Sequence, residues 1–164
     1  SAALSAAHAA HLATGLPLIV RSEPGKRSAD LLDGLRAAGV DPRGVIVADL
    51  ADEPFALLSA GCLILLDAGG GGELHHETNA TLVRAMIDAG RIDQILLGYD
   101  PKSAPAPVFI EQGSRWSWLI DQFPLLLLDA GLSALDARSL MIENPNHALT
   151  TPPPAAAGTL EETT

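Results

Sequence analysis

The residues best placed to do chemistry in this sequence are charged or polar side chains that directly follow short apolar runs. They are Arg21 after 17–20, Asp49 after 45–48, Asp67 after 62–66, and Gly98-Tyr99-Asp100 after 95–97. Apolar runs of this length are typical of buried parallel strands. Because α/β proteins place their chemistry at the carboxyl ends of such strands, we expect these tips to share one sheet edge. Carboxylates there could hold a hard cation, and Arg21 could pair with them.

The elements that position these tips repeat one pattern: a helix, a glycine that ends it, a buried strand and a polar tip. We predict the helices at 2–14, 28–38, 54–60 and 77–89, each followed by glycine. No hairpin signal separates the units, and right-handed crossovers then give four parallel strands in sequential order. The sequence therefore predicts an α/β fold built from parallel βα repeats.

Four such strands cannot close a barrel, but they are half of a (β/α)8 TIM barrel. An open doubly wound sheet is the competing prediction. The glycine loop at 69–72 does not favour it, since the loop lacks the G-x-G-x-x-G pattern and a helix start at the right offset. We expect the half-barrel to occupy residues 1–150.

After Asp100 we expect a proline-rich loop at 101–107, then a helix at 113–130 in which Pro124 starts a new segment or a kink. Ser133 is predicted to cap a last short helix that ends at 143–145. Residues 151–164 are rich in Pro, Ala and Thr, and we predict a disordered tail.

Composition narrows the function classes. The 164 residues carry a net charge of −10 without a long basic cluster, which argues against nucleic acid as a partner. No stretch approaches the length of a membrane helix, and the N-terminus lacks the charged start of a signal peptide, so we expect a cytoplasmic protein without membrane contact.

The chain starts inside a helical pattern, which suggests a fragment or a processed product. Cys62 lies in an apolar run and is expected to be buried.

Several stretches resemble the C-terminal half of the phosphotriesterase-like hydrolases of the amidohydrolase superfamily. They are 13–18 (ATGLPL), 39–47 (GVDPRGVIV), 89–97 (AGRIDQILL), 130–133 (AGLS) and 142–145 (IENP). Their order and spacing are the specific part of the resemblance, which covers roughly residues 10–150. It implies that the four strands correspond to strands 5 to 8 of a (β/α)8 barrel.

The resemblance also implies a two-metal site, usually zinc, that activates water to attack phosphoesters or lactones. The family's ligand positions at strands 5, 6 and 8 carry Arg21, Asp49 and Gly98-Tyr99-Asp100 here, where the family has His, His and Ser-His-Asp. Asp100 alone matches and is the candidate catalytic residue. The family's remaining ligands, from strands 1 and 4, would lie upstream of residue 1.

Two readings of the strand tips stay open. Arg21, Asp49 and Asp100 could form an ion-pair cluster that replaces the metal charge, or Asp49 and Asp100 could hold one metal ion. If the carboxylates are buried, Arg21→Ala should cost about 3 kcal/mol or more. Tyr99 would lie beside this cluster.

We expect His75 and His76 to be loop residues. The resemblance places that loop beside the substrate pocket, so both are candidates for the pocket or the ion-pair cluster. His8 and His11 are predicted to be a surface pair on the first helix.

Two functions follow from these observations. The chain is either a degenerate half-barrel that acts as a structural or partner-binding subunit, or part of a metal-dependent hydrolase completed by an upstream half or a partner. The expected partner is a complementary half-barrel chain or a second copy, with a different chain favoured because it could bring the missing ligands. The cofactor is then none, or zinc if a partner completes the site. We expect strands 17–20 and 94–98 to be open edges, with some of Ile19, Ile46, Ile64 and Leu96 facing water.

Overall fold

The computed structural model describes residues 2–23, 25–50, 52–67, 73–98 and 119–150, and only the backbone of 73–77. The glycine loop at 69–72, Tyr99, Asp100, the loop at 101–107 and the tail at 151–164 lie outside these residues. So does most of the first half of the helix expected at 113–130.

One parallel sheet organises the described chain. Its strands are β1 Leu18–Arg21, β2 Val45–Ala48, β3 Leu63–Asp67 and β4 Ile95–Gly98. They pair in the order β1-β2-β3-β4, as the unit pattern predicts. Two short 3-10 turns, Pro42–Gly44 and Ile92–Gln94, lead directly into β2 and β4. The α/β prediction with four sequential parallel strands is confirmed.

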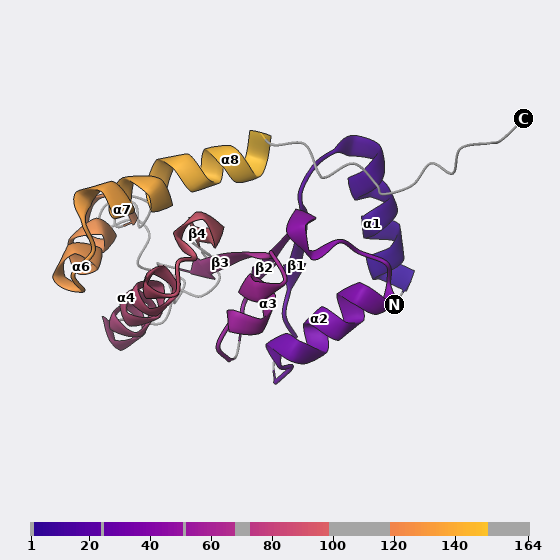
Figure 1. Cartoon of the computed structure of the whole chain (residues 1–164), viewed down its shortest axis with the longest axis horizontal. Helices are drawn as coiled ribbons and strands as arrows, with labels where there is room; N and C mark the ends of the chain where they lie inside the picture. The colour runs from indigo at the N-terminus through magenta and orange to yellow at the C-terminus, as the bar shows by residue number, and fades with distance from the viewer. Residues whose placement is uncertain (1, 24, 51, 68–72, 99–118, 151–164) are drawn as a thin grey trace, which may run out of the picture.

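Helices cover the sheet unequally. The first four are α1 Ala2–Thr14, α2 Ser28–Ala37, α3 Phe55–Ser59 and α4 Glu73–Asp88. The later ones are α6 Phe123–Asp129, α7 Ala134–Arg138, a π-helical turn Ser139–Glu143 and α8 Asn144–Thr150. Figure 1 shows α2, α3 and α4 on one side of the strands and α8 on the other. None of the described helices is long and apolar enough to cross a membrane.

The main core lies between the sheet and the helices that follow the strands. Val47, Ile64 and Ile95 are fully buried there, together with Leu57 of α3 and Met86 of α4. Fully burying a side chain of this size stabilises the fold by about 1.5–3 kcal/mol. This layer is the outer shell of a half-barrel.

The opposite, inner face of the sheet is only partly covered. Ile46 and Leu96 are buried against Ala148 of α8, whereas Ile19 is 57% exposed. The expectation that some of the four residues face water is therefore confirmed by Ile19 alone, since Ile46 and Leu96 are covered by α8. Ile64 is not an inner residue, because it packs into the main core. The period-2 alternation of strands is the cause, since neighbouring residues face opposite sides.

Glycines end the helices that precede the strands, as predicted. Gly39 and Gly90 have φ of 71°, and the next residues, Val40 and Arg91, donate backbone N–H groups back to Leu35 and Met86. This is the Schellman arrangement, in which glycine adopts the left-handed conformation without a Cβ penalty.

Two helix boundaries differ from the prediction. Helix α4 begins at Glu73, four residues earlier than expected, so the backbone of His75 and His76 is helical rather than a loop. The run 73–77 contains residues of good helix propensity, and a single residue such as Thr78 gave a weak signal for the start.

The chain also stays helical beyond the stop expected at 143–145. Pro124 does begin a new segment, α6, and Ser133 does cap α7 through a capping box with Asp136. The turn before Pro145 then widens into a π-helix, in which the Asn144 N–H donates to the Ser139 carbonyl. Pro145 lacks an N–H and its ring crowds the preceding turn, and the wider turn accommodates it without ending the helix.

Asn144 fastens this C-terminal helix to the sheet. Its buried side-chain amide donates to the carbonyls of Ile92, at 2.6 Å, and Ile95, at 2.8 Å. These carbonyls lie at the start of β4, so the contact sets α8 at the amino ends of the strands.

We predict that Asn144→Ala lowers the free energy of unfolding by about 2–3 kcal/mol, because two buried carbonyls lose their donors. Asn146→Ala, on the exposed side of the same helix, is the matched control and should change stability by less than about 0.5 kcal/mol. Urea denaturation followed by circular dichroism measures both variants. Equal midpoints for the two would contradict the role of Asn144.

Candidate functional site

The ends of β1 and β2 bring Arg21 and Asp49 together. Arg21 lies opposite Ala48 in the strand register, and Asp49 is the next residue. The Arg21 Nε donates to the Asp49 carboxylate Oδ2 in a charged hydrogen bond. One residue further along the chain, the Ser22 N–H donates to the Ala48 carbonyl at 2.9 Å and holds the ends of β1 and β2 side by side.

Asp49 has an unusual backbone for a residue with a side chain. Its φ is 58°, and it is the one non-glycine residue with positive φ among the described residues. This left-handed conformation is disfavoured for L-residues, although aspartate tolerates it better than most. The strained turn at the tip of β2 thus accompanies the contact between Asp49 and Arg21.

The Arg21–Asp49 pair is accessible to solvent in this chain. The side chains are 57% and 39% exposed. An ion pair in such a position is worth about 0–1 kcal/mol, because water screens the attraction. The expectation that Arg21→Ala exposes a buried carboxylate at a cost of about 3 kcal/mol is therefore wrong for these residues.

Polar contacts beside this pair stabilise neighbouring strand ends. Asn79, a buried residue of α4, donates its amide to the backbone carbonyl of Asp67 at 2.8 Å. Sequence reasoning missed Asn79, and the available signal was a polar residue inside the apolar stripe of a helix.

The start of α2 is held by a carboxylate from another loop. The backbone N–H of Ser28 donates to Asp52 at 2.9 Å, and the Ser28 hydroxyl also binds it. These hydrogen bonds hold the pKa of the Asp52 carboxyl below its usual value. Arg27 occupies the N-cap position of α2, and Asp52 supplies the oxygen that binds the first N–H group of the helix.

The described residues do not fit a binuclear metal site. No group of three or more His, Cys, Asp or Glu that could hold a metal occurs among them. Asp49 is bound to a guanidinium, which cannot deprotonate to become a ligand. The described residues do not include Tyr99 or Asp100, and His75 and His76 are described by their backbone alone. The structure brings together Arg21 and Asp49 of the predicted set.

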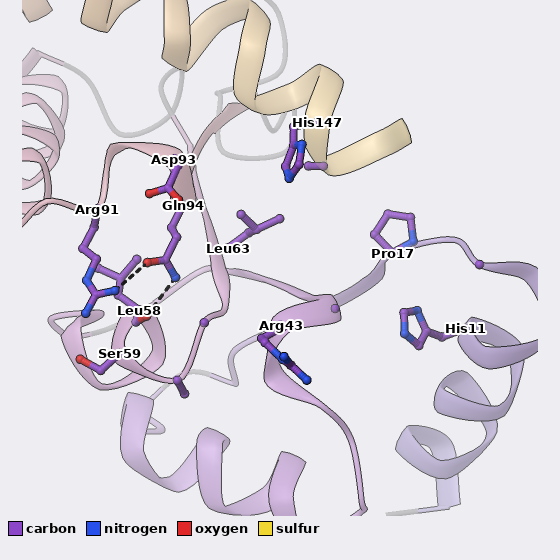
Figure 2. Close-up of a pocket in the computed structure, with 15 residues that line it drawn as sticks. His11, Pro17, Arg43, Leu58, Ser59, Leu63, Arg91, Asp93, Gln94 and His147 are labelled. Atoms are coloured by element: carbon purple, nitrogen blue, oxygen red, sulfur yellow. Dashed lines mark hydrogen bonds between the residues drawn. The ribbon is translucent and has the colours of Figure 1, made fainter. Parts of the chain in front are cut away.

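A hollow lies at the opposite end of the strands from Arg21 and Asp49 (Figure 2). It has a volume of about 490 Å³ and is lined by the segments that lead into all four strands and by α8. Arg43, His11, Arg91 and His147 line it. This is the floor of the half-barrel, remote from the strand tips where the candidate chemistry lies.

Buried polar groups keep this floor in place. Gln94 donates its amide to the carbonyls of Leu58 and Cys62 at 2.9 and 2.8 Å, and Arg91 donates to its side-chain oxygen. His11 is 8% exposed and its Nδ1 lies 2.6 Å from the Leu16 carbonyl oxygen. The prediction that His8 and His11 form a surface pair is thus wrong for His11. This residue is buried and joins α1 to the start of β1.

A model of the phosphotriesterase family matches residues 2–149. The chain belongs to that family. No curated protein shows a significant match to it.

Solved structures of this family and its relatives share the fold. The phosphotriesterase homology protein from Escherichia coli, solved with phosphate in its active site, is 22% identical with a TM-score of 0.74, over 88% of this chain and 51% of its own. An amidohydrolase from Mycoplasma synoviae is 22% identical, with a TM-score of 0.72, over 90% of this chain and 45% of its own. A resiniferatoxin-binding protein from Rhodobacter sphaeroides is 23% identical, with a TM-score of 0.70, over 88% and 45%.

This phosphotriesterase-family chain therefore spans about half the length of the structures that it matches. At identities below 25% the likeness establishes the fold alone. The four strands align with roughly half of a TIM barrel, which confirms the half-barrel prediction and excludes the open doubly wound sheet.

A double-mutant cycle tests the Arg21–Asp49 contact. We predict a coupling free energy of about 0.3–1 kcal/mol between Arg21→Met and Asp49→Asn, falling further in 1 M salt because the pair is exposed. Asparagine retains the tolerance for positive φ, so the cycle isolates the charge. Urea unfolding of the four proteins gives the value, and a coupling above about 2 kcal/mol would show a buried pair instead.

Proposed function

We propose that this chain is a degenerate phosphotriesterase-family half-barrel that acts as a structural or partner-binding subunit, with the family's metal site largely lost. The observation that carries the proposal is the Arg21–Asp49 ion pair at the strand tips.

The pair argues against a metal centre on electrostatic grounds. A divalent cation is held by neutral or anionic ligands, and a guanidinium in direct contact with Asp49 contributes a fixed positive charge instead. The sequence resemblance placed two family ligands at these same two strand tips. The ion pair satisfies the Asp49 carboxylate without any metal.

The open sheet supports the partner-binding part of the proposal. Within the described residues, no strand pairs with the outer edge of β1 or of β4. Ile19 on the inner face of β1 and Leu16 just before it are 57% and 64% exposed. Unpaired edges beside exposed apolar side chains are typical of surfaces that another chain covers.

The alternative function is a metal-dependent hydrolase of the phosphotriesterase or lactonase type, in which an upstream half or a partner supplies the missing ligands. The match of Asp100 to the family's aspartate favours it. Several matched structures are organophosphorus hydrolases from Deinococcus radiodurans, at 18–19% identity.

Metal content separates the two functions. We predict less than one tightly bound zinc per chain after extensive dialysis, because Arg21 and Asp49 replace two histidine ligands. Inductively coupled plasma mass spectrometry of the purified chain gives the number. Two zinc ions per chain would refute the degenerate site and favour the hydrolase.

Association tests the partner-binding proposal. We predict that the purified chain is not a stable folded monomer, because no described residue covers the two sheet edges or the part of the inner face around Ile19. Size-exclusion chromatography with light scattering, combined with circular dichroism, measures mass and folding together. A folded species of 17.0 kDa at micromolar concentration would contradict the proposal.

A further inference from the structure

The pairing register of the four strands shifts in one direction across the sheet, as it does in a closed barrel. Val20 pairs with Val47, Val47 with Ile64 and Ile64 with Ile95, so these residues form one row across the sheet. Val20 is the third residue of β1, whereas Ile95 is the first residue of β4, so the row shifts by two residues relative to the strand starts. When the pairing shifts along the strands in this way but the strand ends stay at one rim, the strands are tilted relative to the axis of the sheet. Strands of a closed barrel have this tilt.

The amount of slip fits eight strands. A TIM barrel has a shear of about eight residues over eight strands, so four strands account for about four residues. In this chain three steps already shift the row by about two residues in the required direction. The direction of this shift is the one that two four-stranded halves need in order to close a ring.

The same count specifies where a second copy would pair. The row Arg21–Ala48–Leu65–Leu96 crosses the whole sheet. In a barrel made of two identical halves, each half contributes four of the eight residues of shear. The row must therefore reach β1 of the second copy at a position four residues away from Arg21. Four residues later is Gly25, beyond the end of β1, so the row must arrive at Pro17.

We propose that two copies of this chain close a two-fold symmetric eight-stranded barrel, in which β4 of each copy pairs in parallel with β1 of the other. Leu96 then lies opposite Pro17 of the second copy, and Gly98 lies opposite Ile19 of the second copy. The proposal rests on the partner-binding function and names its partner.

The side chains at this seam suit the pairing. Pro17 has no N–H to donate, and a first strand position is where a sheet tolerates proline. Ile19 is exposed on the inner face, and in the closed ring it packs beside Leu65, whose methyl carbon lies 2.9 Å from the position of a Cβ on Gly98. Helix α8 covers Ile46 and Leu96 through Ala148 but leaves Ile19 uncovered, so a second copy has apolar surface to bury.

Disulfide trapping tests the register. Within one copy, β1 and β4 are separated by three strand spacings, or about 14 Å. A disulfide needs Cα atoms within about 7 Å, so Cys at positions 19 and 98 cannot join within a chain. Across the proposed seam they are direct neighbours. The native Cys62 does not compete, because burial raises the pKa of its thiol to about 11.

The double variant Ile19→Cys/Gly98→Cys should form a covalent dimer under mild oxidation, with no larger species, because each closed dimer uses both pairs of thiols. Ile19→Cys alone and Gly98→Cys alone are the matched controls. Each should remain uncrosslinked, since the two equivalent positions lie on opposite sides of the barrel. Non-reducing electrophoresis and intact mass report the products.

Other outcomes overturn the proposal in distinguishable ways. A ladder of larger species, or no bridging while the unmodified chain still associates, refutes the closed two-fold barrel but leaves the partner-binding function standing. A folded monomer of the unmodified chain in light scattering refutes both. If the reduced double variant is not folded, Leu18→Cys/Leu97→Cys, one row lower on the outer face, provides the same test with the same outcomes.

Discussion

Parallel pairing of four short strands is the interaction on which the rest of this structure depends. Each strand has four or five residues, and none is stable without neighbours. The pairing positions the tips at one rim and the strand starts at the other. It also creates two open edges, which an isolated sheet of sequential parallel strands cannot avoid. Among the described residues, α2, α3 and α4 cover the outer face, whereas α8 covers only part of the inner face.

The two ends of the strands have different characters. At the carboxyl end, a solvent-accessible ion pair between Arg21 and Asp49 occupies positions where the family resemblance places metal ligands. At the amino end, buried polar side chains such as Gln94 and Asn144 bind backbone carbonyls and hold the helices to the sheet. Among the described residues, buried polar contacts thus hold the amino end together, whereas the carboxyl end carries a solvent-accessible ion pair.

Membership of the phosphotriesterase family is compatible with an ion pair at the strand tips, because the fold depends on residues away from these tips. Glycine stops, apolar strands and the Asn144 contact maintain the half-barrel. None of these features needs a histidine at a strand tip. A chain can therefore retain the architecture, bury its outer core and change the charge at the strand tips from that of a metal site to that of an ion pair.

The sequence by itself determined the repeated units, their strand order and the family. Glycine stops and apolar runs are local signals, and connections without hairpin turns favour parallel strands in sequential order. The pairing of Arg21 with Asp49 was also predictable as an alternative, since parallel strands place their ends side by side. Only the tertiary structure decided which inner residues are covered, because α8 packs on Ile46 and Leu96 from a distant part of the chain. It likewise showed that the ion pair is exposed and that His11 is buried, since burial depends on what packs against a residue rather than on its neighbours in sequence.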